Sequence, residues 1–164
     1  MTSVDSDRRR LIKVTLEEDR SIRRSPEVEH ERAVAVYDLL DENVFCLSGE
    51  AGGPYCLKIG IRENRLVLDV RDPAERPLAE VLLPIRPLRY LIRDYFTVCE
   101  AYYEAIKTAT PSRIEAIDVG RRSIHDDGAA VLRRRLAPRI EIDVRTSRRL
   151  FTLICVLHVR DMRE

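Results

Sequence analysis

YCLKIGIRENRLVLDV, residues 55–70, is the stretch of this sequence that decides the fold. Apolar side chains recur at every second position on both sides of Glu63-Asn64, a period that is typical of β-strands with one buried face. A polar pair between two such runs suits a tight hairpin turn. The stretch therefore predicts two antiparallel strands whose apolar sides cover one core.

The segments around this hairpin extend the same architecture. On the N-terminal side, residues 11–16 alternate like a strand, and Ser25-Pro26 provides an N-cap and a first helical residue. On the C-terminal side, Asp72-Pro73 indicates a turn, and residues 78–83 predict a further strand. We therefore expect an N-terminal strand and helix, followed by an antiparallel β-meander of three to four strands.

The second half of the chain has the period of helices. Apolar residues recur at helical spacing over 88–106, Thr110-Pro111-Ser112 ends that pattern and caps a second helix, and Pro138 ends the second helix. A third helix is predicted over 145–160. Strands followed by helices are typical of the α+β class, so we expect three C-terminal helices packed on one face of the sheet. Residues 1–8 are predicted to be a disordered tail, and 9–164 a single domain.

Composition and charge limit the possible functions. The 164 residues include 29 Lys and Arg against 28 Asp and Glu, and this near balance argues against a nucleic-acid partner. No apolar run approaches the roughly 20 residues of a membrane span, and the polar N-terminus lacks a secretory signal. The four cysteines show no CxxC spacing, which favours reduced core residues over a disulfide framework. The sequence thus predicts a cytoplasmic protein with no cofactor and no membrane partner.

The clearest candidate for a functional site lies in residues 110–128, where ionisable groups border the apolar stripe of the second helix. At about 100° per residue, Arg121 falls on this stripe, and Asp118 and His125 fall at its edge. Asp118 can reach Arg121 or Arg122 one turn away. One interpretation is an anion pocket, in which arginines hold the ligand, His125 is a switchable donor and Asp118 orients them. The other is an ion-pair network that locks the helix to its neighbours.

Gly120 lies inside the same predicted helix, where glycine costs about 1 kcal/mol relative to alanine. Two explanations are open. A close helix crossing is the commoner one, and space left for a ligand is the other.

The preceding helix supplies three further candidates. Glu100 and Glu104 are four residues apart, so their like charges repel, and Tyr103 lies beside them. Di-metal carboxylate bundles need Glu-x-x-His on paired helices, and because that pattern is absent no metal ligand is predicted. The candidate ligand-binding residues are Glu100, Tyr103, Glu104, Asp118, Arg121, Arg122 and His125.

The last predicted helix is apolar on nearly every side between Leu150 and Leu157. Such a helix is buried in a core or in a subunit interface, and we expect a homodimer formed through it. The phosphate-loop, dinucleotide, zinc-protease and nucleophile-elbow motifs are all missing. Our first hypothesis is therefore a non-enzymatic binding or regulatory module with a protein partner. The alternative is an enzyme or sensor acting on a small anionic, phosphorylated ligand through the Asp/Arg/His cluster.

Six segments of the sequence are distinctive: residues 11–16, 29–35, 94–96, 102–106, 115–122 and 148–155. They resemble one small family of alphaproteobacterial proteins of unknown function, uncharacterised protein family 0262. The resemblance runs from about Leu11 to about Arg160 and implies a single-domain, cytoplasmic bacterial protein. Since the family has no assigned activity, the resemblance implies no catalytic or binding residues.

Overall fold

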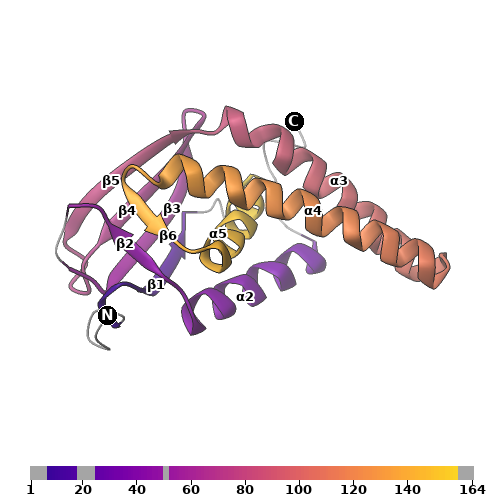
Figure 1. The fold of residues 1–164 in the computed structure, drawn as a ribbon, viewed down its shortest axis with the longest axis horizontal. Coiled ribbons are helices and arrows are strands. Elements are labelled where there is room, and N and C mark those ends of the chain that lie inside the picture. Colours follow the sequence, from indigo (N-terminus) through magenta and orange to yellow (C-terminus); the bar gives the residue numbers. More distant parts are fainter. Residues whose placement is uncertain (1–6, 18–24, 50–51, 159–164) are drawn as a thin grey trace.

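The computed structural model describes residues 7–17, 25–49 and 52–158 of the chain. The first six residues of the predicted tail lie outside these ranges. Strands dominate the first half of the described chain and helices the second, which confirms the α+β class (Figure 1). In chain order the elements are β1 (Leu11–Leu16), α2 (Pro26–Asp41), β2 (Phe45–Leu47), β3 (Tyr55–Arg62), β4 (Arg65–Arg71), β5 (Pro77–Pro84), α3 (Arg86–Thr108), α4 (Pro111–Leu136), β6 (Ile140–Ile142) and α5 (Val144–Leu157).

The larger sheet contains the predicted hairpin, but it is mixed and not purely antiparallel. Strands β3, β4 and β5 are antiparallel neighbours, and Glu63-Asn64 forms the first turn with φ angles of 53° and 61°. Two positive φ values are characteristic of the type I′ hairpin turn. Strand β1 pairs with β3 in parallel, because α2 carries the chain back along the sheet before β3 begins. The strand order is β1-β3-β4-β5.

A second, smaller sheet is formed by β2 and β6. The two strands pair antiparallel and place Phe45 opposite Ile142. Each has three residues, too few to show a period of two, and the pairing joins distant parts of the chain. Sequence periodicity therefore gave no sign of it. The small sheet ties the end of α2 to the segment between α4 and α5.

The helix starts confirm the predicted caps. The Ser25 and Thr110 hydroxyl groups accept hydrogen bonds from backbone amides three residues further on, at 3.2 Å and 3.4 Å. Pro26 and Pro111 follow as first helical residues. Helix α4 then continues through Gly128 without a break and ends at Leu136, shortly before Pro138.

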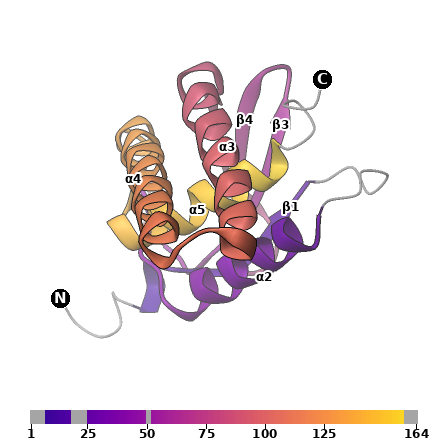
Figure 2. The ribbon, with the colours of Figure 1, turned by 90° about the vertical axis from the view of Figure 1, so that its right-hand side faces the viewer.

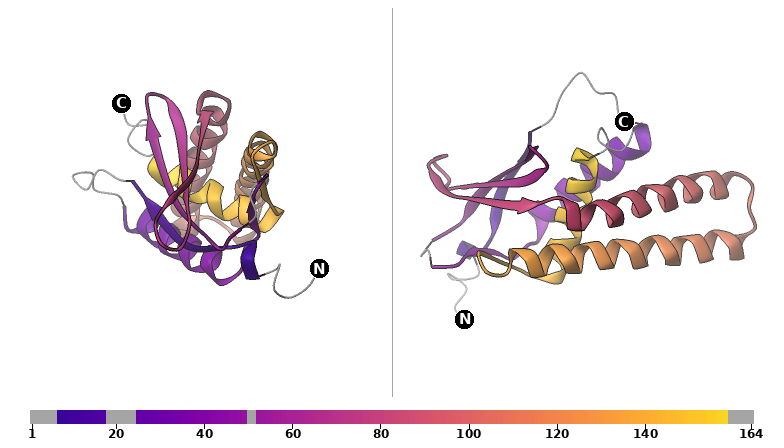
Figure 3. Two further views of the ribbon diagram at one scale, coloured as in Figure 1. Left: turned by 90° about the vertical axis from the view of Figure 1, so that its left-hand side faces the viewer. Right: turned by 90° about the horizontal axis from the view of Figure 1, so that it is seen from above.

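We predicted three C-terminal helices stacked side by side on one face of the sheet, but the structure has a different arrangement. Helix α5 contacts β3 and packs against both α2 and α4, whereas α3 and α4 pack chiefly on each other. These two helices form an antiparallel hairpin that extends away from the sheet (Figures 1 and 3). Viewed along the hairpin, α5 crosses behind it and α2 lies below (Figure 2). The sheet is therefore covered mainly through α5 and α2.

Helix α5 is buried within its own chain. Six of its apolar side chains, all between Leu150 and Val156, are at most 2 % exposed, and Gly128 of α4 lets the Phe151 ring approach closely. A Cβ at Gly128 would lie 2.2 Å from Phe151 Cζ. The apolar residues of α5 from which we predicted a dimer are thus covered by other parts of the same chain. The buried apolar residues of α5 are Leu150, Phe151, Leu153, Ile154, Cys155 and Val156.

The four cysteines are free thiols, and Cys56, Cys99 and Cys155 are buried, as their sequence spacing predicts. Burial, followed by the charge of Glu31, raises the pKa of the Cys99 thiol to about 12, so this group is protonated at neutral pH. Within the described ranges, no helix is long and apolar enough to cross a membrane.

Candidate functional site

A cleft of about 510 Å³ lies between α2, α4 and α5, with one residue of α3 in its lining. Its volume falls in the range of small-molecule binding sites. Because four of its side chains are arginines, we call it the arginine cleft. It is lined by His30, Glu31, Val34, Ala35, Asp38, Tyr95, Arg121, Arg122, His125, Asp126, Arg148, Arg149 and Thr152.

The arginines come as two adjacent pairs, Arg121-Arg122 on α4 and Arg148-Arg149 on α5. On α4, both guanidinium groups pair with Asp118, Arg121 Nη2 at 2.6 Å and Arg122 Nε at 3.3 Å. On α5, Arg148 pairs with an aspartate of α4 at 2.8 Å, and Arg149 with an aspartate of α2 at 3.6 Å. Four guanidinium groups therefore share three aspartates, which are Asp118, Asp126 and Asp38.

Arg121 is the most firmly held of the four. Its Nε and Nη2 atoms both donate to Asp118 Oδ1, at 3.0 Å and 2.6 Å. Its guanidinium carbon lies 5.1 Å from the centre of the Tyr102 ring, within the range of a cation–π contact. Burial alone would lower the pKa of Arg121, but the hydrogen bonds to Asp118 outweigh it, and the pKa is raised overall. The side chain is thus a fixed cation beside the cleft.

His125 is a neutral group in the same cleft. Its Nε2 atom lies 2.7 Å from Thr152 Oγ1, and its ring centre lies 5.2 Å from that of Tyr95 and 5.4 Å from that of Phe151. Burial is the main cause that lowers the pKa of His125 to about 4; the charge of Asp126 opposes this shift, and the charges of nearby arginines add to it. At neutral pH the ring therefore offers hydrogen bonding and not charge.

Glu31 projects into the cleft from α2. One carboxylate oxygen accepts a hydrogen bond of 3.0 Å from the Tyr103 hydroxyl group of α3. Burial, and then the charge of Glu31, raise the pKa of Tyr103, so that the phenol keeps its proton and donates it. In the part of the chain that the structure describes, no lysine, arginine or histidine forms an ion pair with Glu31.

The structure brings together part of the predicted site. Tyr103 lies outside the lining and contacts Glu31, while Asp118 supports the cleft through two of its arginines. Glu100 and Glu104 are exposed and lie outside the lining. Lys107, one turn on, pairs with Glu104 at 3.3 Å and offsets the repulsion that made the two glutamates notable. The predicted residues that line the cleft are Arg121, Arg122 and His125.

The lining residues that α2 and α5 contribute to the cleft are absent from the site predicted from the sequence. The acidic run around His30 and the arginine run at 145–149 are visible as charged segments. A charged run on its own is typical of a solvated helix face, and nothing local indicates that two such runs meet. The packing of α2 and α4 on α5 brings them together. The missed lining residues with polar side chains are His30, Glu31, Asp38, Tyr95, Asp126, Arg148, Arg149 and Thr152.

The two glycines of α4 have different surroundings. A Cβ at Gly120 would meet nothing within 4 Å, so the explanation of a close helix crossing is wrong for this residue. That explanation holds for Gly128, which lies against Phe151. The other explanation, that glycine leaves space for a ligand, requires the open space that the structure has beside Gly120.

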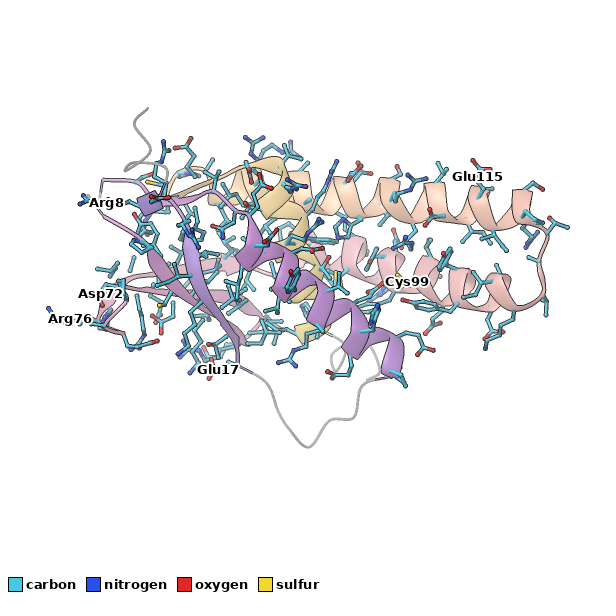
Figure 4. All side chains as sticks on the ribbon, turned by 90° about the horizontal axis from the view of Figure 1, so that it is seen from below. Arg8, Glu17, Asp72, Arg76, Cys99 and Glu115 are labelled. Atoms are coloured by element: carbon cyan, nitrogen blue, oxygen red, sulfur yellow. The ribbon has the colours of Figure 1, made fainter. Side chains whose placement is uncertain are left out.

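Other polar groups lie away from the cleft. Asp72 and Arg76 belong to the β4–β5 turn, where Asp72 accepts from the Arg76 amide, at the end opposite the tip of the helical hairpin (Figure 4). Glu115 lies on the side of α4 that faces away from α3 (Figure 4). Among the described residues, no group of three or more His, Cys, Asp or Glu side chains could hold a metal ion.

Fold and cleft together define a small α+β protein with a charged cleft. The chain belongs to the uncharacterised protein family UPF0262, whose sequence profile matches residues 8–160, and this confirms the resemblance. It is similar to UPF0262 proteins of Paramagnetospirillum magneticum (54 % identity, 93 % of this chain and 98 % of the relative) and Rhodospirillum rubrum (53 %, 92 % of each). A UPF0262 protein of Nitrobacter winogradskyi is 50 % identical over 95 % of this chain and 93 % of its own. No solved structure matches the chain.

Proposed function

We propose that this protein is a non-enzymatic cytoplasmic module that binds a small anionic molecule in the arginine cleft. The observation that carries the proposal is the convergence of four guanidinium groups from two helices on one cleft, where they share three aspartates. Guanidinium groups present planar pairs of donors that match carboxylate and phosphate oxygens. A network that served only to lock helices together would not need two adjacent arginines at one carboxylate.

The chemistry of the cleft favours binding over catalysis. A general acid or base works best with a pKa near the operating pH, whereas the pKa of His125 is lowered to about 4. The hydroxyl group of Thr152, next to His125, is also hydrogen bonded to the Arg148 carbonyl at 3.2 Å. The enzyme alternative would need a group of suitable pKa at the ligand. The described lining residues with shifted pKa values do not supply one.

Cytoplasmic location and the homodimer also remain proposals. Four free thiols fit a reducing compartment. A second copy or another protein partner would need a surface other than the buried residues of α5. Size-exclusion chromatography with light scattering measures the oligomeric state directly. A dimer would direct attention to exposed apolar residues such as Ile106 and Val119 on the helical hairpin.

Isothermal titration calorimetry with inorganic phosphate, succinate and 3-phosphoglycerate tests the proposed function. We expect at least one of these anions to bind the wild-type protein and to raise its unfolding temperature, because a ligand at 100 times its Kd adds about 2.7 kcal/mol to stability. Arg121→Gln should abolish binding. Arg135→Gln, the same change at an exposed position outside the cleft on the same helix, should leave it intact. Equal binding in both variants, or no binding of any anion to the wild type, would overturn the proposal.

A further inference from the structure

The arginine cleft has two arginines of α4 on one carboxylate and, among the described residues, a glutamate of α2 that forms no ion pair. We propose that its ligand is a zwitterion, with an anionic group held by the arginines of α4 and an ammonium group held by Glu31 of α2. This inference rests on the proposed function, because it uses the same cleft. It adds an ammonium group to the anionic ligand proposed above.

The positive end is formed by Arg121 and Arg122. Both pair with the single carboxylate of Asp118, so one positive charge is left over at this end. The side chain of Arg122 is 64 % exposed and its contact with Asp118 is the longer of the two, at 3.3 Å. Arg122 therefore has donors available for an incoming carboxylate or phosphate, while Arg121 is fixed beside it by Asp118 and Tyr102.

The negative end is formed by Glu31. An ionised carboxylate offers about four lone-pair positions, and the Tyr103 hydroxyl group occupies one of those on Glu31. Although Glu31 and Arg121 line one cleft, they form no ion pair with each other in the described structure. The carboxylate of Glu31 is therefore not neutralised by a direct ion pair with Arg121. An ammonium group has three donors and one positive charge, which match what the Glu31 end lacks.

The surface around these charged ends contains Val34, Ala35 and Tyr95, and the cleft has room for a small molecule only. A ligand that spans it would carry a short apolar segment between its charges. Two chemical classes satisfy this description, an amino acid and an aminoalkyl phosphate. They share the ammonium group and differ in the anion.

Matched pairs of probes test the inference by isothermal titration calorimetry. Each pair differs by one ammonium group: propionate with β-alanine, and ethyl phosphate with phosphoethanolamine. We expect the zwitterion of at least one pair to bind about tenfold more tightly than its matched anion, the effect of one charge-assisted hydrogen bond. The pair that shows the difference identifies the anion.

The variant Glu31→Gln removes the charge but keeps an oxygen that can accept from Tyr103. It should reduce the affinity for the zwitterion to that for the matched anion and leave the affinity for the anion unreduced. Glu27→Gln, an exposed position on the same helix outside the cleft, is the matched control and should behave like the wild type.

The outcomes separate the two proposals. If anions and zwitterions bind the wild type equally, or if Glu31→Gln keeps the preference for the zwitterion, the zwitterion inference is overturned while the anion site stands. If neither anions nor zwitterions bind the wild type, both proposals fail together.

Discussion

The two halves of α4 differ in what they contribute to the protein. The C-terminal half is held in the core, and its buried residues are Gly128, Ala129, Leu132 and Leu136. The N-terminal half, 111–127, contains no buried residue and extends along the helical hairpin (Figures 1 and 3). Its ionisable side chains at the arginine cleft or supporting it are Asp118, Arg121, Arg122, His125 and Asp126.

This difference shows how charged groups are positioned without being buried. The packing of the C-terminal half on α5 fixes the direction of the whole helix, because an α-helix is a stiff element. The N-terminal half then presents its arginines at partly exposed positions, where the desolvation cost is smaller than in the core. Substitutions in the packed region should therefore change stability, and those in the cleft should change binding.

The largest effect is expected in the packed region, at Ile154 of α5. This residue is 1 % exposed, so Ile154→Asp would bury a charge without a partner. We expect a loss of more than about 4 kcal/mol and an unfolded chain by circular dichroism. Ile106→Asp, at a 51 % exposed position on α3, should cost about 0.5 kcal/mol or less. A folded monomer from Ile154→Asp would instead support the dimer interface that we first predicted for this helix.

The next effect concerns His125, where the packed and charged halves meet. Its pKa is about 4 in the folded protein against 6.5 ordinarily, so below pH 6.5 the unfolded chain takes up a proton that the folded chain does not. The contribution of His125 to the free energy of unfolding is fully present above pH 6.5. It decreases by up to about 3 kcal/mol as the pH falls to 4.

Urea denaturation at pH 7 and pH 4.5 measures this loss. The decrease in the free energy of unfolding should be smaller in His125→Gln than in the wild type, since the variant has no proton to take up at this position. His30→Gln changes an exposed histidine of the same cleft and should keep the wild-type decrease. Identical decreases in the wild type and His125→Gln would assign the pH dependence to other groups.

A smaller effect is expected from Gly128→Ala in the packed half. The added Cβ would overlap the Phe151 ring, and overpacking of a core costs about 1–3 kcal/mol. Urea denaturation of Gly128→Ala, Phe151→Leu and the double variant measures the coupling between the two positions. The double variant should lose less than the sum of the single losses, because leucine makes room for the Cβ. If the losses of the two single variants add exactly in the double variant, the cost of Gly128→Ala does not come from overlap with the Phe151 ring.

The predictable parts of the fold are those that depend on near neighbours in the sequence. The turn at Glu63-Asn64 and the helix caps at Ser25 and Thr110 each need a few adjacent residues, and all three are present. The parallel partner of β1 and the pairing of β2 with β6 depend on contacts between distant segments. An all-round apolar helix such as α5 has the same sequence pattern in a core and in an interface, so burial in one chain could not be told from a dimer.

The same limit applies to the site. The contact of Asp118 with Arg121 follows from the spacing of one helix, whereas Glu31 and Arg149 enter the cleft through the packing of other helices. Glu100 and Glu104, which we selected for their mutual repulsion, are exposed on α3 and lie outside the lining of the cleft, because spacing alone does not show which face of a helix is covered.

The smallest expected effect, of opposite sign, is at Gly120 in the charged half. Alanine there would meet nothing within 4 Å and would remove the cost of glycine in a helix, so Gly120→Ala should raise the free energy of unfolding by about 1 kcal/mol. Urea denaturation of Gly120→Ala and Gly128→Ala should then show that the same glycine-to-alanine change stabilises the protein in the N-terminal half of α4 and destabilises it in the C-terminal half. A destabilised Gly120→Ala would mean that the open side of this helix is covered in solution. If Gly120→Ala is stabilised but binds the anions of the cleft more weakly, the space beside Gly120 belongs to the ligand.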